Sequence, residues 1–475
     1  MPGDMIYDPD VANLTLAQCL KHFNGMLAFL MGYMAFCAFN YGYDVGTFGG
    51  VQGLHSFTSK FGVCDENGVC ALPGWLSSVM TATPFLGKTL GCIACGWIAE
   101  KWGRKVALLG LCLISFTSSI DSRAQFTLGR IITYGQTGMA IVVVPIYQAE
   151  TAPKELRGMF ASTIQVLIIL GQVVSSLITF GTKNIPNSSG WRIPIGLQLV
   201  APAIEALMFA RTNEDKGTWA EIFDSSNRIR TAVAVLAMFG QQITGQAFPS
   251  QYGVIFYQSQ GFGDKAFLFN VLSNVVSLVA VIFTWFYVDE IGRRPVLMTG
   301  GFFMGLWLFI LGGVGTTKPS NLTGNLKGLE VASIILFGFF YNLSWAPCSY
   351  VVVSEAAALR LKEKTNLFAS VISVLTTFVT SFTTPYLINA QYANLGGKVG
   401  FIYGSFNIAM VVLTFFFIPE LKGRTLEEVD QLFASGAPLR KFKKIQTRTA
   451  TEMYEEEIDR KTGKQGNVDV TAKVA

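Results

Sequence analysis

Long stretches without a charged residue recur along the whole chain. A helix needs about 20 predominantly apolar residues to cross a bilayer, and most of these stretches reach that length. Seven of them contain no Asp, Glu, Lys or Arg: 23–43, 67–87, 159–182, 266–288, 295–317, 331–354 and 399–419. Two more, 231–263 and 365–397, are longer than one span requires.

Three further apolar stretches are less regular. The stretch 131–149 extends backward through Arg130, 193–210 is broken by Glu205, and 106–120 is shorter than a span requires. Together the pattern predicts about twelve membrane-spanning helices, and therefore an all-α membrane protein in which the third helix could be truncated. No small-residue cleavage site follows 23–43, so this stretch is interpreted as a retained helix and not a removed signal peptide.

The composition agrees with a polytopic membrane protein. Apolar residues make up 51% of the 475 residues and charged residues only 14%, against about 25% in a typical soluble domain. These values exclude a disordered chain, a nucleic-acid-binding protein and a secreted disulfide scaffold. The two histidines lack neighbours with metal-ligand spacing, and Cys92 and Cys95 are interpreted as packing residues. We therefore expect no metal and no cofactor.

The distribution of Lys and Arg predicts how the chain is oriented. With both termini inside, the cytoplasmic loops carry more Lys and Arg than the outer loops, as the positive-inside rule requires. Two glycosylation sequons, at Asn187 and Asn321, then fall in outer loops. Cys64 and Cys70 share another outer loop, where a disulfide could persist.

Two pairs of related segments indicate an internal repeat. The segment 96–105 resembles 287–294, and 145–150 with its following Arg157 resembles 349–355 with its following Arg360. Duplicated halves with a central site are typical of transporters. The predicted organisation is an N-terminal segment 1–23, a six-helix bundle 24–210, a short cytoplasmic linker 211–228, a second six-helix bundle 229–418 and a cytoplasmic tail 419–475.

The repeated segments place acidic and basic residues at the predicted cytoplasmic helix ends. Glu and Arg side chains there could pair across neighbouring helices and hold the two halves together until an inner gate opens. The alternative is simple positive-inside anchoring, which does not require such pairs. The candidate gate residues in the repeats are Glu100, Gly103, Arg104, Glu150, Arg157, Glu290, Arg293, Glu355 and Arg360.

These motifs occur in an order that resembles the sugar porters of the major facilitator superfamily, particularly fungal hexose transporters. The matching segments are 42–46 (GYDVG), the two inner loops 103–105 and 292–294, 145–158, 241–245 (QQITG), 345–347 and 419–428 (PELKGRTLEE). The resemblance implies two six-helix halves that rock around a central sugar site. It also adds Glu420, in the last segment, to the gate.

The resemblance further implies which residues contact the sugar. Gln165, Gln241 and Gln242 match sugar-contact positions of the family, and amide side chains can both donate to and accept from sugar hydroxyls. Their alternative role is hydrogen bonding between helices. Further candidates are Asn342 and Tyr350 on the tenth predicted helix and Thr377 and Ser381 on the eleventh.

Asp44 and Arg130 are ionisable residues within predicted spans, and such residues are functional candidates by default. Proton-coupled relatives pair an Asp and an Arg at these two positions, whereas facilitative relatives lack the acid. The expectation is proton symport, and the alternative is a static structural pair. Lys88 and Glu205 also interrupt predicted spans, where they could pair with each other or Lys88 could line the cavity.

Several positions depart from the family pattern. Ala247 stands where the family has a sugar-contacting Asn, and the following 250–252 (SQY) keeps one Tyr of an aromatic pair. The linker between the halves is short as well. These departures leave open a disaccharide, a polyol or a sugar acid as the substrate, and facilitated diffusion as the mechanism.

A non-transporting sugar sensor or degenerate family member is the contrasting hypothesis. Sensors of the family often carry a long signalling tail, and the tail after Phe433 is short, which disfavours that role. The sequence shows no nucleophile paired with a base and no phosphate-binding loop, so an enzyme is not expected. The expected partners are a small sugar, protons and the lipid bilayer, with no nucleic acid, and the protein is expected to be a monomer in the plasma membrane.

Overall fold

The computed structural model describes residues 25–64, 70–101, 122–151, 157–199, 219–224, 227–317, 323–358, 361–389, 391–424 and 426–445. Long helices dominate this part of the chain, which confirms the predicted all-α class. The predicted third helix at 106–120, Glu205 and most of the linker lie outside the described residues. The predicted domain boundaries therefore stay predictions.

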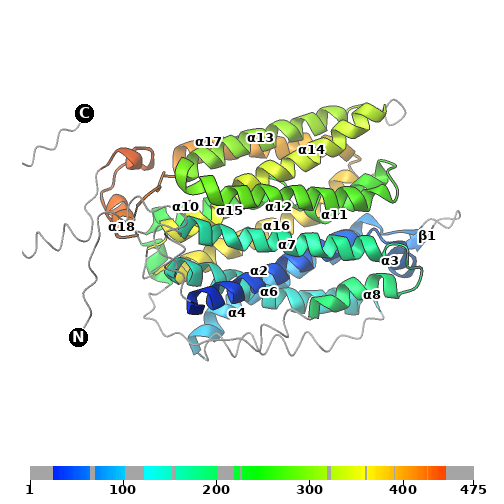
Figure 1. Cartoon of the computed structure of the whole chain (residues 1–475), viewed down its shortest axis with the longest axis horizontal. Coiled ribbons are helices and arrows are strands. Elements are labelled where there is room, and N and C mark those ends of the chain that lie inside the picture. The colour runs from blue at the N-terminus through cyan, green and yellow to red at the C-terminus, as the bar shows by residue number, and fades with distance from the viewer. Residues whose placement is uncertain are drawn as a thin grey trace, which may run out of the picture.

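Within the described residues, the N-terminal half contributes four long helices that run roughly parallel to one another (Figure 1). They are α2 (Gly25–Val51), α4 (Gly74–Lys101), α6 (Arg123–Thr151) and α7 (Arg157–Thr182). The shorter elements are α3 (His55–Phe61), β1 (Val63–Cys64), β2 (Cys70–Ala71), α8 (Ser189–Gly196) and the 3-10 turn η4 (Leu197–Leu199).

The C-terminal half lies alongside the first half (Figure 1). Its helices are α10 (Arg228–Ile243), α11 (Ala247–Ser259), α12 (Lys265–Ile291), α13 (Arg293–Val314), α14 (Gly324–Leu343), α15 (Trp345–Ala356), α16 (Lys362–Ile388), α17 (Val399–Phe417) and α18 (Leu426–Ala434). The 3-10 turns are η5 (Ala220–Phe223), η8 (Gly396–Lys398) and η9 (Leu439–Lys444).

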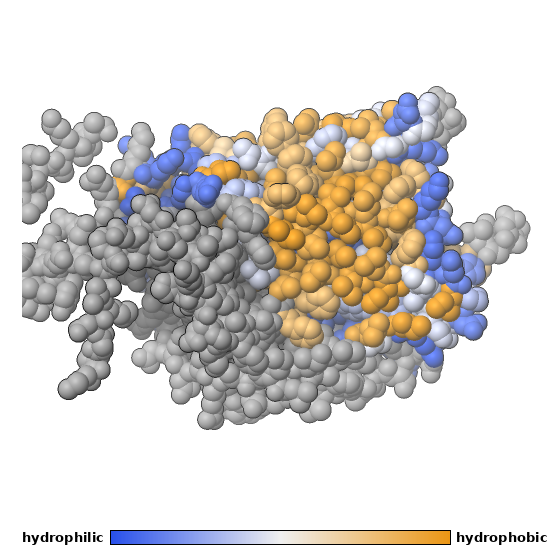
Figure 2. All heavy atoms as spheres, viewed as in Figure 1, coloured by the Kyte–Doolittle hydropathy of each residue, from blue (hydrophilic) through white to orange (hydrophobic). Residues whose placement is uncertain are grey.

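The surface of the bundle is suited to lipid. Six stretches of the described helices are long and apolar enough to cross a membrane, from Ser162–Thr182 in α7 to Gly396–Phe417 at α17. Exposed apolar side chains follow one face of α12 at helical spacing, namely Leu268, Leu272, Val275, Val279 and Phe283. Figure 2 shows a continuous hydrophobic area on the surface, with hydrophilic residues along its border.

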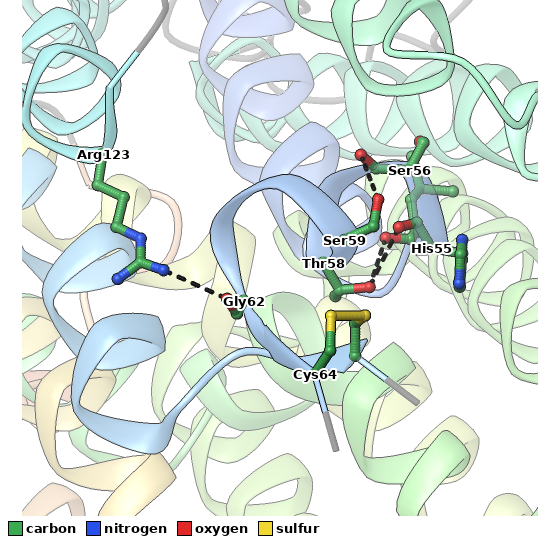
Figure 3. Close-up of a disulfide and its surroundings, with 9 residues drawn as sticks. His55, Ser56, Thr58, Ser59, Gly62, Cys64 and Arg123 are labelled. Atoms are coloured by element: carbon green, nitrogen blue, oxygen red, sulfur yellow. Dashed lines mark hydrogen bonds between the residues drawn. A yellow bond between two sulfur atoms is a disulfide. The ribbon is translucent and has the colours of Figure 1, made fainter. Parts of the chain in front are cut away.

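The two ends of the bundle differ, and we name each by its most distinctive feature. At the disulfide end, a disulfide joins Cys64 to Cys70 and closes the β1–β2 hairpin, as Figure 3 shows. There Arg123, the first residue of α6, donates from Nη2 to the carbonyl of Gly62 at 3.2 Å. At the opposite, Arg293 end, Arg293 begins α13, and α18 lies beyond it.

Two apolar stretches predicted as single spans are broken in the structure. Gly245 separates α10 from α11 with a φ of +97°, a conformation that L side chains rarely adopt. Ser344 separates α14 from α15, and Pro347 lies in the first turn of α15. A continuous helix would place the ring of Pro347 against the carbonyl of Leu343, four residues earlier. The break avoids this clash.

The carbonyl of Leu343, released by this break, is satisfied by the neighbouring helix. Tyr287 of α12 donates its hydroxyl to this oxygen, and Thr284 donates to the same oxygen at 3.4 Å. A backbone group without a partner at membrane depth would cost several kcal/mol. The two α12 hydroxyls therefore make the irregular backbone tolerable inside the bundle.

Glycines let the helices of the N-terminal half touch backbone to backbone. A Cβ added to Gly42 of α2 would lie 1.8 Å from the carbonyl oxygen of Ile168 on α7. Small residues at such crossings are the usual solution for helices in lipid. The α2–α7 pairing therefore depends on the absence of a side chain at Gly42.

Replacing Gly42 by Val should prevent α2 from packing on α7, because the added atoms overlap a backbone that cannot move away. We expect little folded protein, measured as monodisperse material after detergent extraction. The matched control is Gly181→Ala on α7, where an added Cβ meets nothing within 4 Å. A Gly42→Val protein as abundant and heat-stable as the control would contradict this packing.

Candidate functional site

A polar cavity lies between the two halves, next to the breaks in the helices. Tyr41 and Val45 of α2 and Ile168 of α7 form part of its wall. Its other walls come from α10, α11, the segment between them, α14, α15 and α16. The polar lining residues are Tyr41, Gln165, Gln172, Gln241, Gln242, Gln246, Ser250, Gln251, Tyr341, Tyr350 and Thr377. No charged side chain is among the described residues that line it.

Hydrogen bonds within this wall connect the two halves and the two breaks. Gln165 of α7 donates from Nε2 to Oδ1 of Asn342 on α14 at 3.3 Å. Gln241 of α10 donates to the carbonyl of Ala346 in α15 at 2.8 Å, and Gln242 donates to Oε1 of Gln241 at 3.0 Å. The amides thus hold one another in place and face the cavity at the same time.

The structure brings most of the predicted sugar-contact residues together. Gln165, Gln241, Gln242, Tyr350 and Thr377 line the cavity. Asn342 lies one hydrogen bond away, through Gln165. Ser381, one turn beyond Thr377, is buried outside the lining; its carbonyl accepts from the hydroxyl of Tyr252 at 2.7 Å.

The structure also places residues in the cavity that the sequence analysis missed. Gln172 lies seven residues after Gln165, which puts both amides on one face of α7. Gln246 and Gln251 line the cavity too, and the Oε1 atom of each is buried without a hydrogen-bond partner in the part of the chain that the structure describes. The signal was a glutamine-rich pattern at helical spacing within apolar stretches. Ala247 lies in the same wall, at the position where the family has Asn.

Asp44 and Arg130 lie together inside the N-terminal half, but they form no direct ion pair within the described residues. Asp44 is 1% exposed; its Oδ2 accepts from Thr137 at 3.4 Å, and its Oδ1 has no hydrogen-bond partner among the described residues. Arg130 donates to the carbonyl of Met80 at 2.5 Å and to the hydroxyl of Tyr134 at 3.1 Å. Each charge is thus held separately.

Lys88 of α4 is the third buried charge of this region. It is 1% exposed, and its ammonium lies 3.5 Å from the centre of the Tyr41 ring, a cation–π contact. Tyr41 also lines the cavity, so Lys88 lies directly behind the cavity wall. The predicted partner Glu205 lies outside the described residues.

A buried ionic cluster lies at the Arg293 end. Arg293 binds Glu355 through two hydrogen bonds, from Nη2 at 2.7 Å and from Nε at 3.1 Å, and both residues are buried. Glu420 accepts from the backbone N–H groups of Arg293 and Arg294, each at 3.0 Å. Its carboxylate therefore caps the first turn of α13, where an anion is favoured. One arginine thus connects α13, α15 and the segment after α17.

Among the remaining predicted gate residues, only Glu290 has a described side chain, and it does not join this cluster. The Glu290 side chain is exposed, and its backbone carbonyl accepts a hydrogen bond from Lys422. Gly103, Arg104 and Arg360 lie outside the described residues, as do the side chains of Glu100, Glu150 and Arg157. A contact that the sequence analysis missed lies nearby: Arg230 at the start of α10 pairs with Asp430 of α18 and stacks on Phe433 at 4.8 Å.

Replacing Glu355 by Gln should destabilise the protein, because it leaves the guanidinium of Arg293 buried without its bidentate carboxylate. Breaking a buried pair in this way costs about 3 kcal/mol or more. We expect a clear fall in the thermal unfolding midpoint in detergent. Glu290→Gln removes the same charge from an exposed position and should leave the midpoint unchanged. Equal midpoints for the two variants would refute the importance of this pair.

Comparison with known proteins gives a consistent result. The family model described as "Sugar (and other) transporter" matches residues 30–211 and 204–433. The low-affinity glucose transporter of Kluyveromyces lactis is 28% identical over 85% of this chain and 82% of its own. The high-affinity fructose transporter ght6 of Schizosaccharomyces pombe is 25% identical over 86% and 87%. The high glucose sensor RGT2 of Saccharomyces cerevisiae is 27% identical over 95% and 67%.

Solved structures show the same fold. The proton:xylose symporter XylE bound to 6-bromo-6-deoxy-D-glucose superposes with a TM-score of 0.70 at 20% identity, covering 86% of this chain and 98% of that one. An inward open conformation of XylE from E. coli gives a TM-score of 0.64, covering 86% and 99%. The fold is therefore that of the major facilitator superfamily. With the family model matching both halves, the chain belongs to the sugar transporter family, whose members are multi-pass membrane proteins and not enzymes.

Proposed function

We propose that this sugar transporter moves a hexose across the plasma membrane by alternating access, and that proton symport through Asp44 and Arg130 drives uptake. The observation that carries the proposal is the location of Asp44. Its carboxyl group is buried, and the Oδ1 atom has no hydrogen-bond partner among the described residues. The next residue, Val45, lines the central cavity. Proton binding and sugar binding would therefore affect the same short segment of α2.

The cavity wall supports a sugar as the substrate. Amide and hydroxyl groups supply both donors and acceptors, which suits the many hydroxyls of a sugar. The buried Oε1 atoms of Gln246 and Gln251 could each accept a hydrogen bond from a sugar hydroxyl. Relatives are named as glucose, fructose and galactose transporters, which favours a hexose over a disaccharide, a polyol or a sugar acid.

Asp44 and Arg130 form hydrogen bonds to different partners and not to each other, which supports a role in proton coupling over a static ion pair. A structural ion pair would hold both groups within hydrogen-bonding distance, whereas here Thr137 binds the acid while Met80 and Tyr134 bind the arginine. Movement of α6 against α2 could bring the two charges together and release a proton. XylE, which shares the fold, is named as a proton symporter.

The Arg293 cluster joins elements of the C-terminal half alone, so in this proposal it shapes the cytoplasmic end of that half and does not itself tie the two halves together. In this proposal both termini are cytoplasmic, the protein is a monomer, and the disulfide end is extracellular, where a disulfide persists. The Arg293–Glu355 contact and the Glu420 cap stabilise the C-terminal half at its inner end. A sensor remains the second candidate, since RGT2 is a relative.

Replacing Asp44 by Asn tests the coupling. The amide cannot exchange a proton, so in a transporter-deficient yeast strain the internal sugar concentration should rise only to the external value. Exchange of labelled for unlabelled sugar should continue. Asp264→Asn, at an exposed position, serves as the control and should still accumulate sugar. Accumulation by Asp44→Asn at the level of the control would exclude proton symport through this residue.

Replacing Gln165 by Ala tests the sugar site. Loss of a hydrogen bond to the substrate, together with an unpaired Asn342, should raise the KM for hexose roughly tenfold, equivalent to about 1.4 kcal/mol. The exposed Gln125 offers a matched control, Gln125→Ala. Uptake over a range of sugar concentrations measures both. An unchanged KM in Gln165→Ala would remove this residue from the site, and absence of uptake by surface-exposed wild-type protein would favour the sensor.

A further inference from the structure

A second polar cavity lies at the disulfide end, lined by residues of the C-terminal half and close to the start of α4. It is formed where α11, α13 and α16 end, where α14 begins and where the segment after α16 passes through η8. Its volume is ≈ 520 Å³, within the range of about 300–1,000 Å³ typical of small-molecule sites. The central cavity measures only ≈ 50 Å³ on the same scale.

A buried carboxylate faces this outer cavity. Glu330 of α14 lines it and is only 3% exposed, and its Oε2 has no hydrogen-bond partner among the described residues. Lys327 lies one turn earlier on the same helix, yet the two form no ion pair within the described part of the chain. Burying a carboxylate oxygen without a donor is costly. A ligand that donates hydrogen bonds would remove that cost.

The other polar groups restrict the class of ligand. Lys327 and Lys398 line the same cavity, so a metal cation would meet two ammonium groups. An anion would meet the carboxylate of Glu330. Gln260, Asn389 and Asn394 add amide groups that can both donate and accept. A neutral molecule with many hydroxyl groups satisfies all of these side chains together.

The backbone leaves room for such a ligand to approach. Gly261 and Gly396 have φ values of +84° and +49°, which favours glycine at both positions. An added Cβ at Gly396 would meet nothing within 4 Å. The wall also reaches the other half, because a Cβ at Gly74, the first residue of α4, would lie 2.5 Å from Nδ2 of Asn389. A ligand here would therefore lie close to the boundary between the moving halves.

We infer that this outer cavity is a second sugar-binding site, in which Glu330 accepts hydrogen bonds from the ligand hydroxyls and Lys327, Lys398 and the amides donate to its oxygens. The site is distinct from the central cavity. In the orientation proposed above it faces the extracellular side, where a sugar arrives before transport.

The test counts sugars bound to the purified full chain by native mass spectrometry, with D-glucose, D-fructose, D-galactose and D-xylose as probes. We expect two molecules per chain for at least one probe. Glu330→Gln should reduce this to one, because the amide replaces a doubly accepting carboxylate. The double variant Gln165→Ala/Gln241→Ala should also retain one molecule, and the combined triple variant none. Asp264→Asn removes an acid at the same end, outside the cavity, and should bind two.

Three results would overturn the inference. The first is a wild-type chain that binds no more than one molecule of any probe. The second is a second molecule whose binding is unaffected by Glu330→Gln. Loss of binding in Glu330→Gln together with a lowered unfolding midpoint would indicate misfolding, so the thermal midpoint is measured for every variant. Because aspartate keeps the carboxylate, Glu330→Asp is expected to restore part of the binding at the second site. The third overturning result is a folded Glu330→Asp protein that regains no binding at the second site. Transport by the wild type decides the proposed function separately.

Discussion

The two interrupted helices determine where this protein can place polar groups. A bilayer tolerates irregular backbone only where other groups satisfy it. At the second break, the hydroxyls of Tyr287 and Thr284 bind the carbonyl that Pro347 releases. At the first, Asn407 of α17 donates to the carbonyl of Thr244 at 3.0 Å. Because these contacts hold both breaks, the amides beside them are free to line a cavity.

Much of this architecture could be predicted from the sequence. The absence of charge over span-length stretches was sufficient to find the helices, and the GYDVG, QQITG and PELKGR motifs were sufficient to find the family. The breaks were not predicted, because an apolar stretch reads the same whether one helix or two pass through it. Gly245 and Pro347 were the local signals, and their meaning depended on neighbours from α12 and α17.

Site residues that belong to a family motif could be predicted from the sequence, and those outside the motifs could not. Gln165 and the Gln241–Gln242 pair belong to recognised positions, and they do line the cavity. Gln172 and Glu330 belong to no motif. Gln172 is of interest because it is buried in the cavity wall, and Glu330 because it is buried with an oxygen that has no hydrogen-bond partner among the described residues, and only a three-dimensional structure reveals either feature. Glu290 illustrates the opposite case, since the repeat suggests a gate residue and the structure places its side chain in solvent.

Charge and hydrogen-bonding capacity are divided between the halves around the central cavity. The buried charges near it, Asp44, Lys88 and Arg130, all belong to the N-terminal half, while most of the amides and hydroxyls in the wall belong to the C-terminal half. A sugar held mainly by the second half could influence these charges through contacts that cross between the halves, such as the Gln165–Asn342 hydrogen bond, or through the cavity residues of the N-terminal half itself. Tyr41 is one of these N-terminal residues, with the cavity on one side and Lys88 on the other. In the proposed symport, coupling depends on whether binding moves α2 and α7 together, and the close approach of the two backbones at Gly42 favours such a joint movement.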